Sequence, residues 1–315
     1  MKVLTKALIT TAASALALGA AASAQTAYSL DQNGSSLVSF QATGDGSGAS
    51  ATAITSADGA SLSLDALTFR PQTGQLYGYD GSSGSLYVVD PATGVATLEF
   101  QSDDLPDGFV AFDTNPNLDA FRFINADGAN VVYFPQNTAN GTASNAGRLI
   151  TEAPTIMSLM YADGYSVTGT PTLLGNGYTN QLPLNAAQGQ DDDLLQYVLD
   201  AETDTLAVLD NNAGTVDFVA DAGFDFDLAG GFDVFTDGDS DIGYALLTVN
   251  GEQGFYAIDL GTFAFTQLFS IQGGFGALTS LVVADIAPVP VPAAALLFLT
   301  GAGGIAAARR RKAKA

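Results

Sequence analysis

The residues of this sequence that could do chemistry are almost all carboxylates. The 315-residue chain has 33 Asp and Glu residues but no His, Cys or Trp. Without His, a Ser-His-Asp triad or an imidazole base is impossible, and without Cys there is no disulfide or thiolate metal site. Lys occurs only near the two ends of the chain, so the central part cannot use a Schiff base or a phosphate-loop lysine.

Carboxylate-pair chemistry remains open. A glycan hydrolase or lyase could use two acids placed on opposite sides of the bond that it breaks. With 33 acids in the chain, however, some pair will always lie at a suitable distance. Composition alone therefore does not indicate an enzyme, and we keep a carboxylate-based glycan-active enzyme as an alternative to a binding or structural role.

The densest run of acids contains Asp237, Asp239 and Asp241 at alternate positions. This spacing resembles the opening of a Ca²⁺-binding loop, where hard oxygen ligands suit a hard cation. The match then fails, because Ile242 stands where such a loop has Gly and Thr248 where it has Glu. An acidic turn between strands is one interpretation. The other is a weak Ca²⁺ site, the one possible cofactor, in a calcium-dependent adhesion module.

Basic residues are concentrated at the ends of the chain. Between the ends lie only Arg70, Arg122 and Arg148, so with 33 acids this part carries a net charge of −30 (3 minus 33). Such a surface repels nucleic acid and anionic lipid, and we expect no nucleic-acid partner. Because a partly buried Arg needs a partner, we expect Arg70 and Arg122 each to pair with a nearby carboxylate. Anchoring of a substrate is the alternative.

The elements that would position these residues are repeated β-hairpins. Residues 76–90 (LYGYDGSSGSLYVVD) are predicted to form a strand, a polar turn and a second strand. The same pattern recurs at residues 27–40, 121–134, 196–210 and 244–259. In every copy the second strand opens six residues after the first one ends, which predicts one common register. The copies lie 45 to 49 residues apart, except for one interval of 75, and such a period is typical of a β-propeller.

We therefore predict an all-β protein, a five-bladed propeller with four strands in each blade. The long interval predicts an insertion at 162–190 in the fourth blade, after an inner strand at 156–161. The first blade lacks an inner strand, and residues 278–284 (LTSLVVA) remain after the fifth. We predict that this segment completes the first blade and closes the ring, because closure removes exposed sheet edges. Six blades, with the insertion as an extra blade, is the alternative.

Both ends of the chain resemble targeting segments. Residues 1–24 have a basic start, an apolar run and the cleavage-type sequence Ala22-Ser23-Ala24, as in a secretory signal peptide. The propeller domain is then 25–287. Residues 288–315 comprise a Pro-Val-Pro stalk, a short apolar run and a basic cluster expected to stay cytoplasmic. We predict a short transmembrane helix that serves as a stop-transfer and processing signal, with a simple membrane anchor as the alternative.

This tail resembles the VPLPA variant of PEP-CTERM protein-sorting signals. The matching residues are Val289, Pro290, Val291, Pro292 and Ala293, followed by Arg309, Arg310 and Arg311. Val291 stands where the variant has Leu. The resemblance implies an exosortase-type machinery of a Gram-negative bacterium that removes the tail, after transient anchoring in the inner membrane. It also implies delivery to the envelope surface or the extracellular matrix, where an exopolysaccharide or a surface protein would be the partner.

The central part resembles the domain of unknown function 4394 family of secreted bacterial proteins over roughly residues 27–285. The resemblance rests on residues 67–97, 113–138 and the segment Gly230-Gly231-Phe232-Asp233. Its most specific part is NPNLDAFR (115–122), in which Ala120 stands where such proteins often carry Arg. The family implies a propeller-like repeat and no agreed activity. We therefore expect an exported propeller with a binding or structural role.

Overall fold

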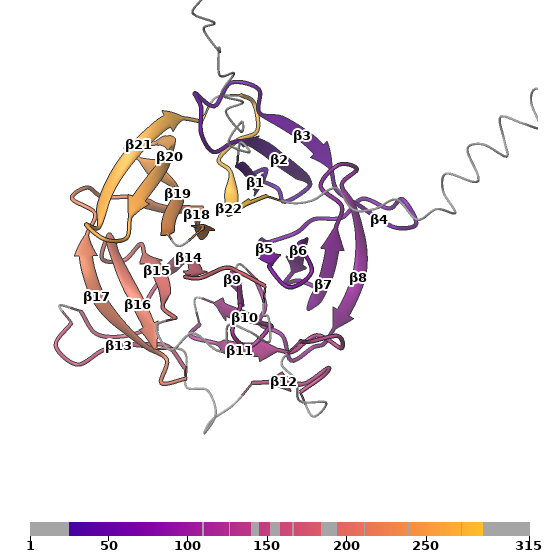
Figure 1. The fold of residues 1–315 in the computed structure, drawn as a ribbon, viewed down its shortest axis with the longest axis horizontal. Helices are drawn as coiled ribbons and strands as arrows, with labels where there is room; N and C mark the ends of the chain where they lie inside the picture. Colours follow the sequence, from indigo (N-terminus) through magenta and orange to yellow (C-terminus); the bar gives the residue numbers. More distant parts are fainter. Residues whose placement is uncertain are drawn as a thin grey trace, which may run out of the picture.

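The described part of the chain folds as a ring of β-sheets. The computed structural model describes residues 25–285, except residues 109, 126, 140–144, 152–157, 166, 184–193, 211, 239 and 272. Within these residues five sheets surround a common axis (Figure 1). The predicted five-bladed propeller is confirmed, and the six-bladed alternative is wrong. Among the described residues, no helix has the length and apolar character needed to cross a bilayer. The predicted signal peptide and the sorting tail at 288–315 lie outside the described residues.

Each blade is a sheet of four or five strands that follow one another from the axis outwards. Blade 1 has β22 (Thr279–Ala284), β1 (Thr26–Leu30), β2 (Ser36–Gln41) and β3 (Ser50–Ala53). Blade 2 has β5 (Ala66–Arg70), β6 (Gln75–Asp80), β7 (Ser85–Val89), β8 (Val95–Gln101) and β4 (Thr55–Ser56). Blade 3 has β9 (Val110–Asn115), β10 (Ala120–Asn125), β11 (Asn130–Tyr133) and β12 (Leu149–Ile150). Blade 4 has β14 (Leu173–Tyr178), β15 (Gln196–Asp200), β16 (Thr205–Asp210), β17 (Thr215–Asp221) and β13 (Met160–Tyr161). Blade 5 has β18 (Asp227–Asp237), β19 (Ser240–Val249), β20 (Glu252–Asp259) and β21 (Ala264–Ser270).

The last strand of the chain closes the ring. β22 pairs antiparallel with β1, with Thr26 opposite Ala284 and Tyr28 opposite Val282. The two strands are about 250 residues apart in sequence, yet they form the inner half of one blade (Figure 1). The prediction that residues 278–284 complete the first blade is confirmed. Without β22 the inner edge of β1 would have no strand to pair with.

The prediction for the fourth blade was wrong in one respect. Its inner strand is β14, which lies inside the predicted insertion, and Met160–Tyr161 instead pairs parallel with β17 at the outer edge. β14 reads LLGNGY and lacks the alternation of a half-buried strand. The alternation is missing because β14 packs closely on blade 5. A Cβ atom added to Gly175 would lie 2.7 Å from the backbone nitrogen of Phe232.

The predicted common register holds in three hairpins out of five. The first, second and fourth hairpins pair Leu30 with Leu37, Tyr79 with Leu86, and Leu199 with Leu206. The third instead pairs Phe123 with Val131, and the fifth turns tightly at Asn250-Gly251. Both residues of that last turn have positive φ, as a two-residue Asn-Gly hairpin turn requires. Turn length, rather than the spacing of apolar residues, therefore sets the register of these two hairpins.

The hydrophobic core lies between neighbouring blades rather than on the axis. Each pair of adjacent blades shares one cluster of buried side chains. Blades 2 and 3, for example, pack Tyr79 against Phe123, with ring centroids 4.9 Å apart. Blades 1 and 5 pack Phe40 against Phe255 at 5.2 Å. Aromatic contacts of this kind hold the blades at fixed angles and leave the inner strands to line the axis.

Candidate functional site

The inner strands approach one another closely around the axis. β22, β5, β9, β14 and β18 follow one another around it, and each contacts the next (Figure 1). The contact between β18 and β22 needs a glycine, because a Cβ atom on Gly231 would lie 2.4 Å from the carbonyl carbon of Ser280. Two small cavities, with volumes of about 10 and about 20 Å³, lie along this axis. The larger one is lined by two buried carboxyl groups, those of Asp113 and Asp233.

Asp113, on β9, is fully buried beside the larger cavity and receives four hydrogen bonds. Its Oδ1 accepts from the Thr68 hydroxyl at 2.8 Å and from the backbone N–H of Thr114 at 2.7 Å. Its Oδ2 accepts from the backbone N–H of Tyr178 at 2.8 Å and from Nε2 of Gln181 at 3.0 Å. These donors come from blades 2 and 4 as well as blade 3. The carboxyl of Asp113 thus ties three consecutive blades together at the axis.

Asp233, on β18, lines the same cavity from blade 5. Its Oδ2 accepts from the backbone N–H of Val283 on β22 at 2.7 Å. Burial and the neighbouring Asp113 carboxyl raise the pKa of Asp233 well above its usual value. Burial raises the pKa of Asp113 to about 7, although its hydrogen bonds oppose the shift. The two carboxyls titrate as a pair, and two like charges in so small a space disfavour double ionisation.

The residues that follow β14 reach the larger axial cavity. The Gln181 backbone N–H donates to the Thr236 hydroxyl at 2.6 Å, and the Asn180 N–H donates to the Asp241 carboxylate at 3.0 Å. These bonds hold the Gln181 side chain over the cavity, where its amide donates to Asp113. Asn180 and Gln181, which lie within the predicted insertion, therefore connect blade 4 to blade 5 beside the axial cavity.

The size of the axial cavity limits its chemistry. A space of about 20 Å³ holds one water molecule or one small ion. Small-molecule sites are typically of some hundreds of Å³, so a sugar ring does not fit between Asp113 and Asp233. The paired carboxyls therefore lack the substrate space that a glycan hydrolase requires.

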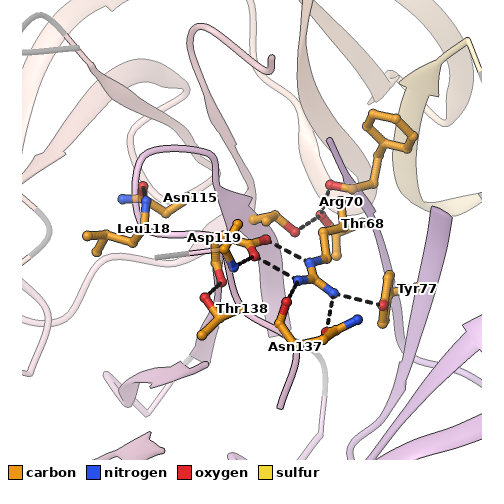
Figure 2. Close-up of polar contacts among 11 residues, drawn as sticks. Thr68, Arg70, Tyr77, Asn115, Leu118, Asp119, Asn137 and Thr138 are labelled. Atoms are coloured by element: carbon orange, nitrogen blue, oxygen red, sulfur yellow. Dashed lines mark hydrogen bonds and ion pairs between the residues drawn. The ribbon is translucent and has the colours of Figure 1, made fainter. Parts of the chain in front are cut away.

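Arg70 forms a buried ion pair that links blades 2 and 3. Its Nε and Nη2 donate to the two carboxylate oxygens of Asp119, both at 2.7 Å, and neither side chain is more than 1% exposed. Nη1 donates to Oδ1 of Asn137 at 2.9 Å and to the Tyr77 hydroxyl at 3.4 Å. Figure 2 shows the guanidinium held between Asp119 on one side and Asn137 and Tyr77 on the other. This two-pronged geometry is the strongest form of Arg–carboxylate contact.

Arg122 links blade 3 to blade 4 through neutral groups. Its Nε donates to the Tyr178 hydroxyl at 2.9 Å, and its Nη1 donates to Oδ1 of Asn130 at 2.5 Å. Tyr178 lies close to both Arg122 and Asp113. Both predicted arginines therefore lie in the interior, where each joins its own blade to the next.

The motif NPNLDAFR (115–122) now has a structural explanation. Oδ1 of Asn115 accepts from the Leu118 N–H at 3.0 Å and holds the turn between β9 and β10 (Figure 2). Asp119 follows with a left-handed backbone, φ 47°, and reaches back to Arg70. Arg122 then reaches forward to Tyr178. One eight-residue segment thus joins three successive blades.

The predicted calcium residues lie at a tight hairpin turn. Asp237 opposes Ser240 across β18 and β19, and Asp239 lies outside the described residues. Asp241 accepts from the Thr236 hydroxyl at 2.6 Å as well as from Asn180. Within the described ranges, no three His, Cys, Asp or Glu residues gather closely enough to hold a metal ion. Calcium binding at this turn stays a prediction.

Many of the other acids hold hairpin turns. The carboxylates of Asp31, Asp80 and Asp200 accept backbone N–H groups of the turn that follows their strand, and those of Asp90, Asp210 and Asp259 do the same one turn later. These are local bonds between an Asp and the residues two to five positions ahead. Much of the acidity that the composition displays is therefore structural.

Sequence reasoning missed the axial residues Asp113, Gln181 and Asp233, and also Asn176 at the second cavity. One signal could have found two of them. The inner strands of blades 3 and 5 each contain a Phe-Asp pair, Phe112-Asp113 and Phe232-Asp233. An acid at the same place in two repeats, on the strand nearest the axis, predicts that the two carboxyls face each other. Gln181 carries no such signal, because it lies in an irregular segment.

Comparison with known proteins places the chain in a family. No curated protein sequence matches it. Among solved structures it is similar to an auxiliary nutrient binding protein from Bacteroides thetaiotaomicron (13% identity, TM-score 0.39, covering 69% of this chain and 55% of that one). It is also similar to a chain of a nidogen/laminin complex (13% identity, TM-score 0.40, covering 82% of this chain and 98% of that one). A protein from Lactobacillus plantarum is similar as well (12% identity, TM-score 0.38, covering 78% of this chain and 66% of that one). The chain thus spans about half the length of the first of these. The family described as a domain of unknown function (DUF4394) matches residues 17–282, and the chain belongs to this family.

Proposed function

We propose that the protein is an exported β-propeller that acts as a binding or structural component of the envelope surface or the extracellular matrix. Exosortase-type machinery would process its C-terminal sorting signal. The proposal rests on the position of the strand that closes the ring. The closing strand β22 ends at Ala284, and the sorting motif begins at Val289. Removal of the tail would leave every described strand of the ring intact.

The pairing of β22 with β1 strengthens this proposal. Thr26 lies opposite Ala284, so the mature N-terminus and the start of the tail leave the ring from the same blade. A single tether at that point can hold the protein at a membrane and then release it without opening a sheet. The buried carboxyls and arginines are engaged between blades, which suits a rigid scaffold that binds partners through its surface.

Cell fractionation of the full-length protein tests the proposal. An epitope tag placed in the exposed turn 57–60 would report the location and length of two proteins. These are the wild type and the triple variant Arg309→Ala, Arg310→Ala, Arg311→Ala. Wild type is expected at the surface or in the medium, shortened at its C-terminus, whereas the variant should stay uncleaved. Arg148→Ala, which removes an exposed arginine of the ring, is the matched control and should behave as wild type.

Two results would contradict the proposal. Full-length wild-type protein in the cytoplasm would rule out export. Uncleaved wild-type protein in the inner membrane would indicate that the tail is a simple membrane anchor and not a processing signal. A glycan-degradation screen on the same purified protein addresses the enzymatic alternative, and turnover that survives Asp113→Asn would point to acids outside the axis.

A further inference from the structure

Three aromatic rings gather at the outer edge of blade 4, where β13 lies beside β17 (Figure 1). The rings of Tyr161 and Tyr165 lie 4.6 Å apart, and the ring of Phe218 lies 6.2 Å from Tyr165 at an angle of 77°. Phe218 is 56% exposed, and both tyrosines are half-buried. The Tyr161 hydroxyl donates to the Asp200 carboxylate at 2.7 Å, and the Tyr165 hydroxyl lies 2.9 Å from that of Thr205. These bonds hold the two tyrosines in place, while part of this edge aromatic cluster stays open to solvent.

Blade 2 builds the same edge without the rings. Its β4 pairs parallel with β8, as β13 pairs with β17, and residues 55–60 (TSADGA) match residues 160–165 (MYADGY). In both blades the first residue of this segment donates its N–H to a glycine carbonyl, and the exposed apolar residue of the outer strand lies four residues after that glycine. Blade 2 carries no ring at the three positions that carry one in blade 4: they are Ser56, Ala60 and Leu98. The added strand and its turn form without aromatic side chains, so the fold alone does not account for the edge aromatic cluster.

The charges around the edge aromatic cluster are negative. Asp163 is exposed in the turn between the two tyrosines, and Glu202 is exposed close to Tyr161. Of the arginines in the described ranges only Arg148, on blade 3, is exposed. The face of an aromatic ring attracts a cation that lies within about 6 Å of its centre, and nearby carboxylates add to the attraction. The cluster therefore suits a ligand that carries positive charge.

We propose that the edge aromatic cluster binds a polysaccharide that contains amino sugars, with a sugar ring packed against Tyr165 and Phe218 and its ammonium group beside Asp163. The apolar face of a sugar ring can pack on an aromatic face, and the ammonium group adds a cation–π contact. A polymer can lie across an open edge, whereas the axial cavities of about 10 and about 20 Å³ admit no sugar. The choice of a polysaccharide over a basic peptide rests on the proposed function, because a matrix component meets polysaccharide. The positive charge of the ligand rests on the cluster itself.

Calorimetric titration with a glucosamine hexamer tests the site. The full-length protein is titrated at pH 6, where the amino groups carry protons, and in 0.15 M NaCl, which screens the general attraction of an acidic surface. The double variant Tyr165→Ala/Phe218→Leu should bind about tenfold more weakly than wild type. It gives blade 4 the residues that blade 2 carries and leaves the net charge unchanged, so loss of binding reports the rings alone. Leu98→Ala, which removes the exposed apolar side chain of blade 2, is the matched control and should bind as wild type.

Three results would overturn the proposal. They are no binding by wild type, unchanged binding by the double variant, and equal binding of an N-acetylglucosamine hexamer, which lacks the charge. Equal binding of hexalysine, lost in the double variant, would replace the polysaccharide with a basic protein segment. If circular dichroism shows the double variant to be unfolded, Phe218→Leu alone decides, with an expected loss of about threefold at this exposed position. The titration uses purified protein, so a failure of export in the fractionation experiment would leave its outcome unchanged.

Discussion

Replacing Asp119 with Asn should strongly destabilise the ring. The substitution keeps the size of the side chain and suits the left-handed backbone at this position, since Asn tolerates a φ of 47°. What changes is the charge opposite Arg70. Two charge-assisted bonds of 2.7 Å are lost, and an NH₂ group can face the buried guanidinium. The variant therefore isolates the cost of leaving one buried charge without its partner.

The structure sets the expected size of this effect. Removing one partner of a buried ion pair costs about 3–5 kcal/mol of unfolding free energy. Arg70 would keep its bonds to Asn137 and to the Tyr77 hydroxyl, so part of its charge stays solvated by neutral groups. We therefore expect the lower end of this range, about 3 kcal/mol.

Urea unfolding followed by far-UV circular dichroism measures this effect, because the chain has no Trp for fluorescence. The set is wild type, Asp119→Asn, Arg70→Met and the double variant. The double variant should cost less than the sum of the singles, because the second substitution removes the charge stranded by the first. Asp217→Asn, on the exposed face of β17, should change stability by less than about 0.5 kcal/mol. A loss below about 1 kcal/mol in Asp119→Asn, or strict additivity, would refute the reasoning.

Three further predictions concern the axis and the closure of the ring. In EDTA, the free energy of unfolding should fall as pH rises from about 4 to about 8, because the folded state holds protons on Asp113 (pKa about 7) and Asp233 that the unfolded chain releases near 3.8. Urea midpoints at pH 5 and pH 8 check the sign of this effect, and a higher midpoint at pH 8 would contradict it. Gly231→Ala should cost about 1–3 kcal/mol of unfolding free energy in urea, because the new Cβ atom forces β18 away from the backbone of β22. Gly44→Ala, whose Cβ atom would have only a 3.9 Å contact, should be nearly neutral, and equal effects of the two substitutions would argue against close packing at the axis. A chain that ends at residue 277 lacks β22 and should lose cooperative unfolding in thermal scans; a sharp wild-type-like transition would show that closure is dispensable.

The architecture could be predicted because its signals are local. Each hairpin encodes its own alternation and turn residues within about 15 positions, as residues 76–90 illustrate, and repetition of that unit indicates the wheel. The closing strand could be inferred by elimination, since the first blade lacked an inner strand and residues 278–284 remained. Neither inference needed knowledge of a contact between blades.

The inner strand of blade 4 could not be predicted in the same way. β14 is fully buried, and both of its glycines lie against the backbone of β18, so it carries Gly where a strand normally carries large apolar residues. The registers of the third and fifth hairpins were also mispredicted, because a shorter turn shifts the pairing while the apolar spacing stays the same. The first error comes from a constraint imposed by the neighbouring blade, and the second from the length of the hairpin's own turn.

By itself the sequence determined the number of blades, the strand that closes the ring and the types of chemistry that the absent residues exclude. Only the tertiary structure decided that Asp113 and Asp233, 120 positions apart in the chain, share one cavity. It likewise selected Asp119, among 33 acids, as the partner of Arg70. The physical reason is that periodicity is a property of one strand and its turn. A contact at the axis depends on how five separately encoded blades close around a common centre.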